Sequence, residues 1–197
     1  MMGKTHALAA LLLFVPIAIN SFLGKDLVVF SFFLFLGSLM PDMDTKKGEI
    51  KTRIFGNLLP LIAFVSNIFL FPLRILGWMK HREITHSFLG LALIGGIWAF
   101  VFSKVDPVAG SGLILGYLSH LFVDVSTKTG IPLFFPLKFR IKGFLRTGGW
   151  QEYVFLVLLG VMGYLFFYHN IGFEVAIVTM VTINCITYLF SKISETI

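Results

Sequence analysis

Hydrophobic residues along the 197-residue chain gather into long runs, and polar residues are concentrated in the short segments between them. The runs lie at 7–23, 27–40, 54–79, 87–103, 107–125, 152–168 and 171–191. Apolar stretches of this kind predict helices that are buried in a bundle or surrounded by lipid. The pattern therefore predicts an all-α fold in which residues 1–197 form a single domain.

Composition indicates that lipid, rather than water, surrounds these helices. Hydrophobic residues make up 57% of the chain and charged residues 13%, and the mean hydropathy is +0.90. A soluble domain would carry roughly 25% charged residues. We therefore expect a polytopic membrane helical bundle with the lipid bilayer as its first partner. The single cysteine, Cys185, excludes a disulfide within the chain.

The positions of the basic residues predict how often the chain crosses the bilayer. If the run at 54–79 does not cross, only Lys25 and Lys104 lie on one side, and 14 of the 16 lysines and arginines share the other. Pro60 and Pro72 interrupt that run, as they would a re-entrant hairpin. Because basic residues favour the cytoplasmic side, we expect about six transmembrane helices plus a re-entrant or interfacial hairpin at 54–79. Both termini are then cytoplasmic, and the protein is placed in the inner (plasma) membrane.

In this topology, histidines and aspartates from distant parts of the chain meet on the cytoplasmic side. The set is His6, Asp42, Asp44, His81, His86, His120 and Asp124. His120 and Asp124 are four residues apart, so on a helix they share one face and can share a metal ion. Asp42 and Asp44 follow Pro41 at a spacing that suits a loop, where such a pair can bridge ions or orient a bound water.

The segment "KHREITHSF" contains two further candidate ligands, His81 and His86. On one continuous helix, side chains five residues apart diverge by about 140°. They can converge only if a helix starts between them, and Thr85 or Ser87 could cap that start.

Each of these motifs has an ordinary interpretation when taken alone, since His6 suits a membrane interface and an acidic pair after proline suits a solvated turn. Together they indicate more, because ionisable groups near membrane depth are unfavourable without a function. Seven candidate ligands exceed the four of a structural metal site. We therefore expect a centre of one or two divalent transition-metal ions, with Zn as the first choice and Mn or Fe as the alternatives.

The motifs "PDMD", "HREITHS", "GYLSHLFVD" and "TKTGIPLFFP", after an N-terminal histidine, resemble the YdjM-like family of inner-membrane metal-dependent hydrolases over residues 2–155. The resemblance implies a hydrolase and the same seven ligand positions. It departs at Glu83, where the family has glycine, so the local turn differs and Glu83 could add a carboxylate. The resemblance also implies a role for Glu152 as a ligand or general base, although a carboxylate there also suits a helix N-terminus.

These observations lead to one functional expectation and one alternative. A metal-activated water at the cytoplasmic face would hydrolyse a phosphoester of a lipid substrate, a phospholipid or polyprenyl phosphate. The catalytic candidates are Asp44, Arg82 and Glu152, with the planar guanidinium of Arg82 suited to phosphate. The alternative is a metal-ion transporter or sensor. A net charge of +6 without a nucleic-acid-binding motif predicts no nucleic-acid partner.

Overall fold

The computed structural model describes residues 3–44, 84–137, 139–170, 178, 179 and 182. Within these residues the regular elements are helices, accompanied by two isolated β-bridges. The helices are α1 (Gly3–Ser21), α2 (Lys25–Leu39), the 3₁₀-helix η1 (Met40–Asp44), α5 (Phe88–Gly90), the π-helical turn η2 (Leu91–Gly95), α6 (Gly96–Ser103), α7 (Pro107–Val125) and α8 (Trp150–Tyr168). The all-α prediction is confirmed.

Five of the predicted apolar runs, 7–23, 27–40, 87–103, 107–125 and 152–168, correspond to described helices. The run at 54–79 and nearly all of the run at 171–191 lie outside the described residues.

Local sequence signals set the starts of two helices. The Asp106 carboxylate accepts a hydrogen bond from the backbone N–H of Val108 at 2.9 Å, and Pro107 occupies the first turn of α7, where its missing N–H does no harm. The Ser87 hydroxyl accepts from the N–H of Gly90 at 3.1 Å and caps α5. Ser87 was one of the two predicted caps. The helix that it caps begins after His86, however, and not between His81 and His86.

Helix α7 is the centre of the described bundle, because α1, α2 and α6 all pack against it. Its closest neighbour is α2, and glycines make that approach possible. A Cβ atom on Gly116 would overlap the carbonyl oxygen of Leu34, and one on Gly112 would lie 2.6 Å from the carbonyl oxygen of Phe30. The pair forms a Gly-x-x-x-Gly motif, which lets two helix backbones come close together in a membrane.

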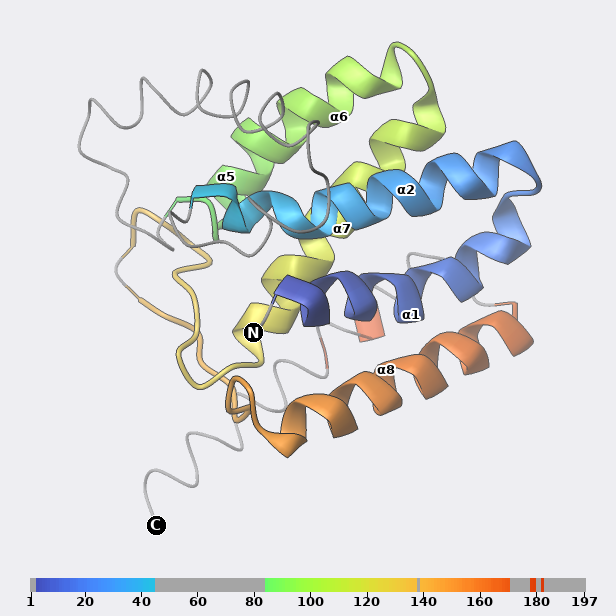
Figure 1. Cartoon of the computed structure of the whole chain (residues 1–197). Helices are drawn as coiled ribbons and strands as arrows, with labels where there is room; N and C mark the ends of the chain where they lie inside the picture. Colours follow the sequence, from blue (N-terminus) through green and yellow to red (C-terminus); the bar gives the residue numbers. More distant parts are fainter. Residues whose placement is uncertain (1–2, 45–83, 138, 171–177, 180–181, 183–197) are drawn as a thin grey trace.

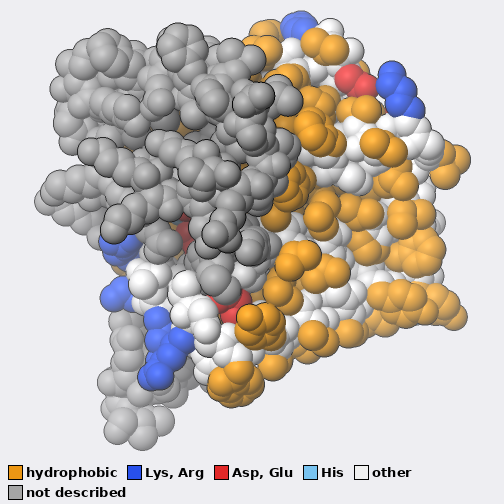
Figure 2. Space-filling model, in the orientation of Figure 1, with side chains coloured by type: hydrophobic (Ala, Val, Ile, Leu, Met, Phe, Trp, Pro, Cys, Tyr) orange, Lys and Arg blue, Asp and Glu red, His pale blue; other side chains and the backbone are white. Residues whose placement is uncertain are grey.

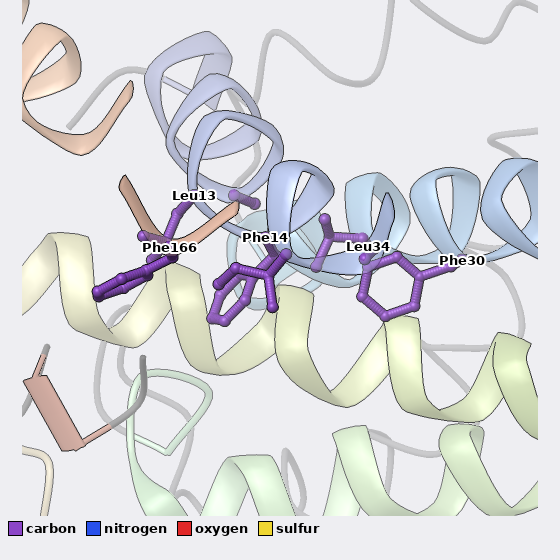
Figure 3. Close-up of a cluster of buried hydrophobic side chains, with 8 residues drawn as sticks. Leu13, Phe14, Phe30, Leu34 and Phe166 are labelled. Carbon is purple, nitrogen blue, oxygen red and sulfur yellow. The ribbon is translucent and has the colours of Figure 1, made fainter. Parts of the chain in front are cut away.

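Apolar side chains fill the space between α1, α2 and α8. Leu13 and Phe14 of α1 meet Phe30 and Leu34 of α2, and Phe166 of α8 covers the same cluster (Figure 3). These side chains are almost completely removed from solvent. The cluster fixes α1 against α2, and so it fixes the relative positions of the polar residues at the ends of both helices.

The outer surface of the described bundle is apolar, as expected for a protein in lipid. Figure 2 shows hydrophobic side chains over much of the visible described surface, and α8 exposes large residues such as Val157, Leu158 and Tyr164. By length and composition, α7 and α8 could each cross a membrane, while Thr5–Ser21 and Phe88–Ser103 are shorter apolar helices. Six transmembrane helices therefore stay a prediction.

The polar ends of the helices lie at one end of the bundle. In Figure 1, the beginnings of α1, α5 and α8 and the ends of α2 and α7 lie toward the same side, next to the segment that joins α7 to α8. We call this segment, residues 126–149, the connecting loop. Lys25, the first residue of α2, and Lys104, which follows α6, lie at the opposite end.

Candidate metal centre

Five of the seven predicted ligands come together at this end of the bundle. They are His6 in the first turns of α1, Asp42 in η1, His86 just before α5, and His120 and Asp124 in the last turns of α7. The side chains of His6, His86, His120 and Asp124 are at most 1% exposed, whereas that of Asp42 is 15% exposed. The residues are therefore enclosed in protein, and Asp42 marks the most open edge of the group.

The first set of possible ligands consists of His6, His120 and Asp124. His6 Nε2 lies 3.3 Å from Asp124 Oδ1. The rings of His6 and His120 stack with their centroids 3.8 Å apart and their planes at 13°. The Nε2 atoms of both stacked rings approach the Asp124 carboxylate, that of His6 at 3.3 Å from Oδ1 and that of His120 at 3.6 Å from Oδ2.

The second set consists of Asp42, His86 and His120. His86 Nε2 lies 3.4 Å from Asp42 Oδ1 and 3.3 Å from His120 Nε2. The Oδ2 atom of Asp124 joins the two sets, at 3.4 Å from His86 Nε2 and 3.6 Å from His120 Nε2. Each carboxylate oxygen of Asp124 thus faces a different histidine, Oδ1 facing His6 and Oδ2 facing His86.

A backbone contact fixes the orientation of His120. Its Nδ1 lies 2.6 Å from the carbonyl oxygen of Ser38. Since a carbonyl can only accept, Nδ1 carries the proton and donates it, which leaves the lone pair on Nε2 toward the other ligands. Ser38 lies at the end of α2, where carbonyls lose helical partners, and Pro41 three residues later has no N–H to offer.

Because one lone pair binds one ion, His120 cannot serve two separate ions at once. The two sets therefore form one centre rather than two independent sites. Ligand atoms around an ion with bonds of about 2.0–2.1 Å are separated by roughly 3.3 Å at tetrahedral angles. The contacts of 3.3–3.6 Å among His86, His120 and Asp124 are close to this separation.

The environment of His6 also fits a metal ion. Its side chain is fully buried, its Nδ1 has no hydrogen-bond partner among the described residues, and its Nε2 has only the 3.3 Å contact with Asp124 Oδ1. A buried imidazole in this state is unfavourable unless something else satisfies its lone pair. A transition-metal ion would do so, which makes His6 a candidate ligand.

The protonation of the two candidate ligands outside the long helices also suits a metal. Burial raises the pKa of the Asp42 carboxyl, but the contact with His86 and the nearby imidazoles outweigh it and hold that pKa well below its usual range. Burial, together with the nearby His120, lowers the pKa of the His86 imidazole, although Asp42 and Asp124 act to raise it. An ionised Asp42 and a neutral His86 are the forms that bind metal ions.

Of the other predicted site residues, only the Glu152 side chain is among the described ones. His81 and Arg82 lie outside the described residues, and so does the side chain of Asp44, which ends η1. Glu152 is buried in the first turn of α8, where its Oε2 accepts a hydrogen bond from the N–H of Gly148 at 2.7 Å. It belongs to neither set of ligands, so this contact supports the helix-terminus interpretation of Glu152.

Sequence reasoning missed the residues that hold His86. The His86 Nδ1 atom lies 3.0 Å from the hydroxyl of Thr85, and the Tyr117 hydroxyl donates to the Thr85 carbonyl at 2.6 Å. If Nδ1–H donates to the Thr85 hydroxyl, Nε2 is left free to bind a metal. The sequence held only a weak signal for these contacts. A threonine beside a histidine is common, and Tyr117 is far from Thr85 along the chain.

We expect Thr85→Val to weaken metal binding by about 10- to 100-fold, the usual effect of losing a group that orients a histidine ligand. Valine keeps the shape of the side chain and leaves the backbone carbonyl for Tyr117, so the hydroxyl alone is lost. Competition with a fluorescent chelator would measure the affinity. Thr85→Ser keeps the hydroxyl and should bind as the wild type does. Equal affinities for the two variants would show that the hydroxyl does not orient His86.

A helical bundle with an apolar outer surface and buried histidine and aspartate groups at one end is consistent with a membrane protein that holds a metal ion. Comparison with known proteins then gives its family. The chain belongs to the YdjM inner membrane protein family, whose model matches residues 1–194.

The chain is similar to the uncharacterized protein YvsG of Bacillus subtilis, with 28% identity over 171 residues, or 85% of this chain and 95% of that protein. It is also 31% identical over 112 residues to the inner membrane protein YdjM of Escherichia coli and, equally, of Shigella flexneri. That alignment covers 54% of this chain and 49% of YdjM, so the chain matches about half the length of those relatives. No solved structure matches the chain.

Proposed function

We propose that this protein is a membrane-embedded metal-dependent hydrolase that cleaves a phosphoester of a lipid. The observation that carries the proposal is the convergence of five histidine and aspartate side chains, four of them buried, at one end of an apolar bundle. Ionisable groups buried together in a membrane protein are a functional site by default. The proposed topology has six transmembrane helices, with both termini and this end of the bundle on the cytoplasmic side.

The chemistry of the described residues indicates a role for each of them in the proposed reaction. Mixed nitrogen and oxygen ligands favour a divalent transition metal, with Zn as the first choice and Mn or Fe as alternatives, over Ca or Mg. Such an ion would activate a water and stabilise charge on a phosphoryl oxygen. His86 and His120 present Nε2 lone pairs in orientations set by Thr85 and Ser38. Asp42 lies at the most open edge of the centre, where its ionised carboxylate would hold the metal on the side from which a substrate can approach.

A lipid phosphoester suits the position and charge of the site. The centre lies at one end of the bundle (Figure 1), which in the proposed topology would face the lipid headgroups of the cytoplasmic leaflet. Basic residues are also concentrated on this side: Lys128, Arg140, Lys142 and Arg146 belong to the connecting loop, and Arg82 lies between two candidate ligands in the sequence. Their positive charge favours an anionic substrate.

The proposal predicts that Asp42→Ala abolishes turnover of a membrane lipid. The full chain would be reconstituted with a total membrane lipid extract and Zn²⁺, Mn²⁺ or Fe²⁺, and the products identified by mass spectrometry. Because the change removes a ligand and its charge, we expect the rate to fall by at least about 100-fold, since the metal's charge stabilisation is worth several kcal/mol. Asp26→Ala removes the same side chain at the opposite end and should leave the rate unchanged.

Identical lipid profiles for wild type and Asp42→Ala with every metal would contradict the hydrolase. Metal flux into vesicles that depends on Asp42 would then favour the transporter.

A further inference from the structure

The connecting loop combines exposed positive charge with a lack of acidic residues. Its described basic side chains, Lys128, Arg140, Lys142 and Arg146, are all exposed. No aspartate or glutamate occurs in the sequence between Asp124 and Glu152. The four cations therefore have no acidic partner within their own segment.

The same loop exposes large apolar side chains at its tip. Phe134 is 49% exposed, Leu137 64% and Phe139 50%. Trp150, where the loop enters α8, is 73% exposed. Apolar side chains gathered on a short surface segment indicate a binding surface rather than a face in contact with water, and exposed tryptophans beside basic residues are typical of a membrane interface.

The backbone of the loop is folded and holds these side chains outward. Ile131 and Ile141 exchange two backbone hydrogen bonds of 3.1 and 3.0 Å, and the N–H of Lys128 donates to the carbonyl of Leu145 at 2.9 Å. The N–H of Phe88 donates to the carbonyl of Leu133 at 2.9 Å, which attaches the tip to the start of α5. The loop is thus a fixed surface next to the segment that carries His86.

The two ends of the loop indicate what covers this surface. It joins α7 to α8, the two described helices that are long and apolar enough to cross a membrane. A loop between such helices lies at the bilayer surface, where phosphate groups and the first acyl carbons are found together. The apolar tip suits the acyl boundary, and the exposed lysines and arginines suit anionic headgroups.

We propose that the connecting loop binds anionic phospholipid headgroups of the bilayer that holds the protein. Phe134, Leu137 and Phe139 enter the acyl boundary, while Lys128 and Lys142 pair with lipid phosphates above it. The binding does not require hydrolysis, so it goes beyond the proposed function. Where both hold, the loop concentrates phosphate-bearing lipids beside the metal centre.

Lipid affinity of the purified full chain in an uncharged detergent tests the proposal. Native mass spectrometry would compare dioctanoyl phosphatidylglycerol, dioctanoyl phosphatidylcholine and inorganic phosphate. We expect Lys128→Gln/Lys142→Gln to lower the affinity for phosphatidylglycerol by roughly 25-fold, about fivefold for each charge near the membrane surface. Affinities for phosphatidylcholine and for inorganic phosphate should be weak in all variants.

The matched control is Lys25→Gln/Lys104→Gln, which removes the same two charges from the opposite end and should change the affinity by less than about twofold. Neither pair touches the metal centre, so an effect of the first pair alone belongs to the loop. Equal losses in the two variants would overturn the proposal, since they would reflect net charge only. Binding of phosphatidylcholine or inorganic phosphate as tight as that of phosphatidylglycerol would also overturn it. Failure of the lipid-turnover assay alone would leave the proposal standing.

Discussion

Replacing His120 with alanine should reduce the metal content of the purified protein from about one or two ions per chain to background. His120 belongs to both sets of candidate ligands, and its Nε2 lies 3.3 Å from His86 Nε2 and 3.6 Å from Asp124 Oδ2. Replacing His120 therefore removes the ligand that the two sets share. We expect a larger loss of metal affinity than the change of about 10- to 100-fold for Thr85→Val. His120→Ala removes a ligand itself, whereas Thr85→Val removes only a group that orients a ligand.

Elemental analysis after reconstitution with Zn²⁺, Mn²⁺ or Fe²⁺ would measure the metal content, with circular dichroism to show that the helices remain. His169→Ala provides the matched control. His169 is an exposed histidine that follows α8 at the end of the bundle away from the centre, so its replacement should leave the content unchanged. If wild type and His120→Ala hold the same amount of every metal, the residues described here are not a metal centre.

Gly116→Ala is expected to destabilise the protein and weaken metal binding together. The added Cβ would overlap the Leu34 carbonyl oxygen on α2, so α2 and α7 must move apart. Overpacking of this kind typically lowers the free energy of unfolding by about 1–3 kcal/mol, or roughly 2–12 °C in Tm for a chain of this size. The same movement draws the Ser38 carbonyl away from His120 Nδ1 and loosens the orientation of that ligand.

Thermal unfolding in detergent and the affinity for Zn²⁺ would be measured on the same samples. Gly96→Ala is the control, because the nearest atom to its added Cβ is the Leu91 carbonyl oxygen at an ordinary 3.8 Å. Alanine there should be neutral or slightly stabilising, since it favours helix more than glycine does. Equal Tm values for the two variants would show that the α2–α7 contact is not as tight as described.

The sequence predicted the helices well, because an apolar run records where a chain can be surrounded by lipid or packed helices. The run at 107–125 has the same bounds as α7, and the run at 27–40 extends one residue beyond the end of α2. The sequence also predicted that His6, Asp42 and His86 gather at one end of the bundle. That prediction came from the distribution of basic residues, which assigned each helix end to one side of the membrane.

The internal arrangement of the centre could not be predicted in the same way. The contact between His120 and the Ser38 carbonyl depends on how closely α7 approaches α2. A sequence motif identifies side chains that could bind a metal, but it does not show which backbone carbonyl accepts a hydrogen bond from one of them. The π-helical turn Leu91–Gly95 is a second example, since nothing in its apolar sequence distinguishes it from a regular helix. The start of α5 after His86 depends on the Ser87 cap, one of two equally suitable residues.

The candidate ligands are widely spaced along the chain, and this has a consequence for biosynthesis. His6 and Asp42 are synthesised early, with α1 and η1, but His120 and Asp124 follow only when α7 is made. Until then, the early histidine and aspartate of the nascent chain lack their partners from α7. A metal ion that needs ligands from α7 could therefore bind only after α7 has been made and packed against α1 and α2.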